Sequence, residues 1–196
     1  MSNISDFKSQ LTGGGARPNL FKCKVTFPRE LSTDTLTKLG SFMIKGAQLP
    51  ASIVAPVEVP YLGRKLKVAG DRTFEPWTIT VINDEGMEIR NAFETWMDLI
   101  NDNKSNTSFY SVGGNKALNY MQSVEVEQLG RNGAGHGTSS GLGDAIKSYK
   151  LIDAFPTNIS AIDLNYETND TIEEFTVEFN YQYWVSNTTA AQAPSN

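Results

Sequence analysis

Side chains suited to catalysis are scarce in this sequence, because it contains one histidine, His136, and one cysteine, Cys23. His136 lies in the glycine-rich segment 130–144, which lacks the rigid, partnered surroundings that a general base needs. Cys23 alternates with apolar neighbours, so we expect a buried and unreactive thiol. One histidine and one cysteine cannot build a zinc site of the usual type. The sequence therefore predicts no catalytic or metal centre of these kinds.

The remaining candidates for chemistry are a glycine-rich loop and pairs of glutamates. Segment 130–144 has neither the glycine spacing of a dinucleotide-binding loop nor a P-loop lysine, so we expect a long, mobile hairpin loop that adds nothing to the core. The glutamates of each pair are spaced along a strand so that both lie on one face. A polar surface explains these pairs more simply than catalytic acids do. The pairs are Glu125 with Glu127 and Glu174 with Glu178.

Charge is unevenly distributed along the 196 residues, whose formal net charge is −5. Residues 120–185 carry ten carboxylates and only three basic side chains, whereas the rest of the chain has an excess of two positive charges. The negative total argues against a protein that binds nucleic acid through its phosphates. The densest basic stretch comes directly before a clear strand pattern and includes Arg64, Lys65, Lys67, Asp71 and Arg72.

Length and composition favour one domain, which we place at residues 1–185, followed by a polar, disordered tail at 186–196. No run of 18 apolar residues occurs, so no membrane span is predicted. The first residues lack the basic and apolar regions of a signal peptide. A lone cysteine forms no intramolecular disulfide, which fits synthesis in a reducing cytoplasm.

Most of the elements that the sequence predicts are strands, and these strands would position the basic and acidic residues named above. Three prolines, Pro50, Pro56 and Pro60, make the stretch that contains them an edge strand or a loop rather than a central strand. Segments 41–49 and 64–70 are weaker strand candidates. Alternation of apolar and polar residues predicts strands at 20–27, 77–82, 120–129, 145–153, 159–166 and 172–184, the last two as a hairpin.

Helix patterns are fewer. The spacing of Ile89, Phe93, Trp96 and Ile100 predicts an amphipathic helix within residues 84–103. Residues 4–11 are expected to form a short helix, and residues 28–40 a loop or a helical turn. The sum is a mainly β protein with one amphipathic helix covering a sheet.

Three blocks of the sequence are distinctive: ARPNLF at 16–21, RKLKVAGDRTFEPWTITVINDE at 64–85, and FPTNISAIDLNYETNDTIEEFTVEFNYQYW at 155–184. Together they resemble the tail tube proteins of contractile-tailed, T-even-like bacteriophages. Their order and spacing agree with the family, and the similarity spans most of residues 4–184. Segments 28–40 and 130–144 are longer than the family norm.

The resemblance implies a two-sheet, barrel-like sandwich flanked by one amphipathic helix. It implies that six copies form a ring and that rings stack into the inner tube that conducts the phage genome during ejection. The implied partners are other copies of the chain, the tail sheath, baseplate and tail terminator proteins, and a tape-measure protein in the lumen. DNA is expected to pass without tight binding. The expected location is the virion tail, after assembly in the host cytoplasm, with no cofactor, no enzymatic activity and no membrane insertion by this chain.

Two sets of residues are candidates for this function. Arg64, Lys65, Lys67, Asp71 and Arg72 are predicted to form a subunit or ring interface, because dense basic side chains need carboxylates from another copy. Glu125, Glu127, Glu174 and Glu178 are candidates to face the lumen, where negative charge repels DNA phosphates. Two alternatives are a tube protein of a bacterial contractile secretion or injection system and a monomeric carbohydrate-binding β-sandwich.

Overall fold

The computed structural model describes residues 3–11, 15–31, 34–109, 119–130, 145–167 and 169–187. The protein is mainly β, as predicted. Its helices are α1 (Ile4–Gln10), α2 (Asp34–Met43) and α3 (Glu88–Ile100). Its strands are β1 (Phe21–Val25), β2 (Ile44–Ala47), β3 (Ile53–Tyr61), β4 (Arg64–Thr73), β5 (Trp77–Ile82), β6 (Gln122–Leu129), β7 (Ala145–Ile159), β8 (Glu174–Asn180) and β9 (Tyr183–Ser186).

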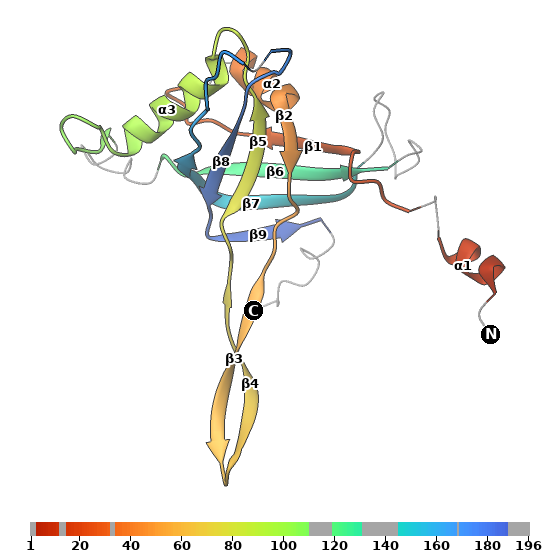
Figure 1. Cartoon of the computed structure of the whole chain (residues 1–196). Coiled ribbons are helices and arrows are strands. Elements are labelled where there is room, and N and C mark those ends of the chain that lie inside the picture. The colour runs from red at the N-terminus through yellow and green to blue at the C-terminus, as the bar shows by residue number, and fades with distance from the viewer. Residues whose placement is uncertain are drawn as a thin grey trace.

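Two antiparallel sheets share the long strand β7 (Figure 1). Sheet A has the order β1-β6-β7-β9 and uses the first part of β7, up to Ala154. Sheet B has the order β7-β8-β5-β2 and uses residues 155–159. The strands of sheet B cross those of sheet A in Figure 1, and β3 and β4 form a separate hairpin. This is the two-sheet sandwich that the resemblance implies.

The core lies between the two sheets and is closed by α3. Alternate residues of β1, β6, β5 and β8 are buried, as the sequence pattern predicts. Helix α3 contributes Phe93 and Trp96, whose rings contact Phe27 at centroid distances of 5.3 and 5.7 Å. The Trp96 indole donates a hydrogen bond to the Tyr120 carbonyl at 3.0 Å, so its polar atom is satisfied inside the core. The predicted helix within 84–103 is thus confirmed.

Two predictions about local structure were wrong. Most of segment 28–40 forms the ten-residue helix α2, which takes in residues 41–43 as well, because Leu36, Leu39 and Met43 pack against the core from one face. Segment 159–166 is not a strand, except for its first residue. Residues 155–159 of β7 pair with β8 in its place. The predicted strand 172–184 is divided into β8 and β9, and β9 continues one residue past the predicted domain end, to Ser186.

No helix in the described part of the chain is both long and apolar enough to cross a membrane.

Candidate functional site: a projecting hairpin and two open sheet edges

Of the two residues considered first for catalysis, the structure describes Cys23 alone. Cys23 is 1% exposed, and burial raises the pKa of its thiol to about 12. A thiol with that pKa is protonated at neutral pH, so it is a poor nucleophile. His136 lies outside the described residues. Across the ranges that the structure describes, no three His, Cys, Asp or Glu side chains are grouped so as to hold a metal ion.

The hairpin of β3 and β4 projects away from the sandwich (Figure 1). Every residue of β3 is exposed, and in β4 only Gly70 is partly covered. The stretch predicted to be an edge strand or a loop forms the edge strand β3 around Pro56 and Pro60, and the 64–70 strand candidate extends to Thr73. A two-stranded hairpin is marginally stable by itself in water. The observed geometry therefore favours a hairpin that is completed by another protein surface.

Register gives the hairpin two unlike faces. Val57 pairs with Val68 and Val59 pairs with Leu66, so four apolar side chains share one face. Their exposed fractions range from 45% for Val59 to 63% for Leu66. The sequence alone does not predict this face, because the apolar positions become neighbours only once the pairing of β3 with β4 is known. An exposed apolar face of this extent is typical of an interaction surface.

All five predicted interface residues lie in β4 of this hairpin and are exposed. Lys65 Nζ forms an ion pair with Glu58 Oε2 across the hairpin at 2.7 Å. Within the described residues, Arg64, Lys67, Asp71 and Arg72 make no ion pair. Glu58 also lies directly opposite Lys67 in the β3–β4 register, so one carboxylate faces both lysines. Three arginine and lysine side chains of β4 thus have no ion-pair partner among the described residues.

Two glycines determine the shape of the hairpin. Leu62 and Gly63 form its turn with φ values of 45° and 78°, the positive values that favoured two-residue hairpin turns require. Gly70 lies at the bulge in the β3–β4 pairing, where an added Cβ would be 2.5 Å from the Ala55 carbonyl oxygen. Only glycine fits such a close approach of two strands.

The four candidate lumen residues lie on the outer faces of two different sheets. Glu125 and Glu127 belong to sheet A, where Lys24 and Lys22 are their respective partners on β1. Lys150 Nζ also contacts Glu125 Oε1 at 3.4 Å. The outer face of sheet A is consequently a mixed, slightly basic surface. This surface is not predictable from local sequence, because the lysines come from strands that are distant from Glu125 and Glu127 along the chain.

Glu174 and Glu178 lie on the outer face of sheet B with Thr176 between them. Thr78 and Thr80 of β5 pair with Glu178 and Thr176, so the face is rich in hydroxyl groups and carboxylates. Lys45 forms an ion pair with Glu174 at one border of this face. In a sandwich the outer faces of the two sheets point in opposite directions. One bore can therefore be lined by Glu174 and Glu178 or by Glu125 and Glu127, but not by all four.

Sheet B has an open edge on each side. At one side of the sheet β2 pairs with β5 through one of its edges, and no described strand pairs with the other edge of β2. At the other side residues 155–159 pair with β8, and β6 ends its pairing at Ala154, so the outer side of this stretch has no described strand partner. A groove of about 570 Å³ runs beside this stretch and is lined by it and by the C-terminal half of α3 and the residues after it. Open edges of this kind are templates for pairing with another chain.

Proteins with a similar sequence are phage tail tube proteins. The family profile described as phage tail tube protein matches residues 16–187. The tail tube protein gp19 of Enterobacteria phage T4 is 31% identical over 173 residues, which cover 88% of this chain and 93% of the relative. The tail tube protein of Serratia phage KSP90 is 25% identical over 188 residues, which cover 95% of this chain and 98% of the relative.

Solved structures with a similar fold come from contractile injection systems. A chain of the anti-feeding prophage baseplate has a TM-score of 0.57 at 12% identity, with 88% of this chain and 95% of that chain covered. A chain of the sheath-tube complex of an extracellular contractile injection system has a TM-score of 0.53 at 13% identity, with 91% and 96% covered. Identities this low establish a shared fold only.

Proposed function

The chain belongs to the phage tail tube protein family, and from this membership we propose that six copies form a ring and that rings stack into the inner tube of a contractile phage tail. The proposed tube conducts the genome during ejection. The observation that carries the proposal is the pair of open edges of sheet B, at β2 and at residues 155–159. One copy presents both edges, so each copy can join a neighbour on either side.

The proposed ring contact places β2 of one copy beside residues 155–159 of the next. Such a contact joins unlike surfaces, and it closes into a ring when the rotation between copies is a whole fraction of a turn. Sheet B would then continue from copy to copy as a closed barrel with no exposed strand edge. The groove beside α3 gives the incoming strand a place to lie.

This arrangement assigns the bore to the outer face of sheet B. Glu174 and Glu178, with the threonines between and beside them, would line the lumen. Carboxylates repel DNA phosphates, and threonine hydroxyls offer no positive charge, so DNA slides without tight binding. Glu125 and Glu127 would lie on the outside of the tube, towards the sheath. Tight, salt-sensitive binding of DNA to assembled tubes would contradict this assignment.

The hairpin is proposed to join rings rather than subunits within a ring. It projects along the direction of the sheet B strands and away from both open edges (Figure 1). Its partner is another copy of the chain, and the residues concerned include Arg64, Lys65, Lys67, Asp71 and Arg72. The remaining proposed partners are the sheath protein outside, the baseplate and tail terminator proteins at the tube ends, and a tape-measure protein in the lumen. The role is structural, and no catalytic step is assigned to the chain.

Electron microscopy of the concentrated protein tests the proposal, with and without added baseplate to nucleate growth. Rings with sixfold symmetry, or tubes built from them, are expected. The triple variant Arg64→Glu, Lys65→Glu, Lys67→Glu should keep the melting temperature of the monomer, because these side chains are exposed, and should lose tube growth. Normal tubes from the triple variant would refute the hairpin's role, and a strictly monomeric wild-type protein would refute the whole proposal.

The two alternatives are less well supported. A tube protein of a bacterial injection system shares the fold, but the sequence relatives at 25–31% identity are phage tail tube proteins. A carbohydrate-binding sandwich would be monomeric, and sedimentation of the concentrated protein separates it from a tube protein.

A further inference from the structure

The end of the molecule opposite the hairpin carries loop 160–173, whose described residues, 160–167 and 169–173, are largely exposed and include both apolar and acidic side chains (Figure 1). Leu164, Tyr166 and Ile172 are 80%, 104% and 70% exposed. The loop has a net charge of −4 and contains no lysine or arginine. Large apolar side chains exposed together on one short segment are typical of a surface that another protein covers.

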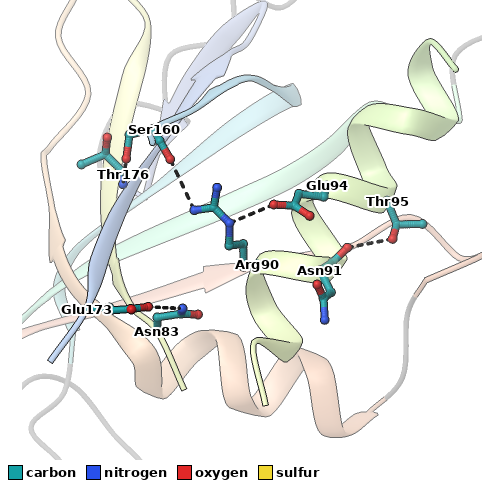
Figure 2. Close-up of polar contacts among 8 residues, drawn as sticks. All are labelled: Asn83, Arg90, Asn91, Glu94, Thr95, Ser160, Glu173 and Thr176. Atoms are coloured by element: carbon teal, nitrogen blue, oxygen red, sulfur yellow. Dashed lines mark hydrogen bonds and ion pairs between the residues drawn. The ribbon is translucent and has the colours of Figure 1, made fainter. Parts of the chain in front are cut away.

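Both ends of this loop are held by the body of the protein, as Figure 2 shows. The guanidinium of Arg90 donates a hydrogen bond to the Ser160 carbonyl at 3.4 Å, and the Thr176 amide donates to Ser160 Oγ at 2.9 Å. At the other end the Asn83 side-chain amide donates to Glu173 Oε2 at 3.0 Å. A hollow of about 370 Å³ lies between residues 161–165 and 171–174. The loop is therefore a supported surface with a recess, which lowers the entropic cost of binding.

The tip of the β3–β4 hairpin is apolar and belongs to a basic segment, so it complements the acidic loop 160–173. Leu62 is 86% exposed and has a φ of 45°, a left-handed backbone value that is unfavourable for leucine. Asparagine followed by glycine is the preferred sequence for this kind of turn, so local structure does not explain the leucine. A strained and fully exposed apolar residue points to a contact made elsewhere. Residues 53–73 carry a net charge of +2, opposite to that of the loop.

We infer that the hairpin tip of one copy docks on loop 160–173 of a copy in the next ring, with Leu62 in the recess and Arg64 and Lys67 facing the carboxylates of Asp163, Glu167 and Asp170. The inference rests on the proposed stacking of rings and identifies its contact surfaces. The occupant is a second copy of this chain, because the two surfaces lie at opposite ends of one molecule and carry opposite charge. A head-to-tail contact of this kind repeats without limit along a filament, as a tube requires.

Disulfide trapping tests the contact, since Cys23 is buried and leaves the wild-type chain without a reactive thiol. The variant Leu62→Cys with Leu164→Cys, whose second site lines the recess, should form tubes in reductant and give a ladder of covalent multimers on oxidation. Each single-cysteine variant should run as a monomer under denaturing conditions, because its one exposed thiol would face a surface that has no cysteine. The matched control Leu62→Cys with Ile146→Cys, whose second site is also exposed at 54%, should give no ladder.

A charge exchange tests the same contact without cysteines. Arg64→Glu with Lys67→Glu should abolish tubes and keep rings, as should Asp163→Lys with Glu167→Lys. The four changes together should restore tubes. Wild-type tubes combined with no ladder from the double-cysteine variant, or no restoration by the four changes, would overturn this inference while leaving the proposed function intact. Wild-type protein that forms neither rings nor tubes would overturn both.

Discussion

Replacing Gly70 by alanine should uncouple tube assembly from folding. The new Cβ would lie 2.5 Å from the Ala55 carbonyl oxygen and 2.9 Å from a methyl carbon of Val57. Close carbon–oxygen contacts in sheets are about 3.3–3.6 Å, so the two strands must separate by roughly 0.8 Å or more. Overpacking of this kind costs about 1–3 kcal/mol. An isolated hairpin has little or no stability to offset that cost, so its pairing should be lost or shifted near the bulge.

The folded body should hardly respond to the change. None of the buried core residues belongs to β3 or β4. A surface change within about 0.5 kcal/mol shifts the melting temperature of a chain this long by less than about 2 °C. Calorimetry should therefore show a nearly normal melting temperature, while light scattering and electron microscopy show no tube growth.

The matched control is Gly63→Asn in the same hairpin. Gly63 has a φ of 78° and no atom within 4 Å of an added Cβ, and asparagine tolerates positive φ better than most residues. This variant should keep tube growth. Gly70→Ala tubes that grow at the wild-type rate would refute the role of the hairpin. A fall in melting temperature of more than about 5 °C would show instead that the hairpin is part of the folding unit, contrary to the burial pattern.

Three further predictions concern the body and the glycine-rich loop. Trp96→Ala should lower the free energy of unfolding by about 3–5 kcal/mol, because it leaves a cavity beside Phe27 and removes the hydrogen bond to the Tyr120 carbonyl; urea titration measures this, and a loss below about 1 kcal/mol would contradict the described core. The thiol of Cys23 has a pKa raised from 9.0 to about 12, so between those values the unfolded chain releases a proton that the folded chain keeps, and stability falls as pH rises. The slope is about 1.4 kcal/mol per pH unit, and Cys23→Ala should remove it from urea titrations at pH 9 to 11; an unchanged slope would show that the thiol is not buried in solution. Shortening segment 130–144, which lies almost entirely outside the described residues, should leave the monomer folded with its melting temperature nearly unchanged, and a large drop would show that the segment supports the core.

The strands of the sandwich were predictable because their side chains alternate between core and surface within one chain. The predictions for 20–27, 77–82 and 120–129 are confirmed on this basis. The same rule failed at 159–166, where Ile162, Leu164 and Tyr166 alternate but Leu164 and Tyr166 are exposed. Burial within this chain does not explain that pattern, and the proposed contact with another copy would account for it.

The candidate site was predictable in part. The basic residues at 64–72 were identified from their density in the sequence, and all five are exposed on the projecting hairpin. Its apolar face depends on the pairing of Val57 with Val68, which local sequence does not reveal. The lysines beside Glu125 come from β1 and β7, which are distant in the sequence. Helix α2 was missed because Gly40 and several polar residues weaken its pattern, although Leu36, Leu39 and Met43 have helical spacing.

A cryo-electron microscopy reconstruction of assembled rings or tubes tests the central claim most directly. The account predicts sixfold symmetry, with β2 of each copy paired to residues 155–159 of its neighbour and with Glu174 and Glu178 facing the lumen. Rings in which those two edges face solvent, or in which the outer face of sheet A lines the bore, would contradict it.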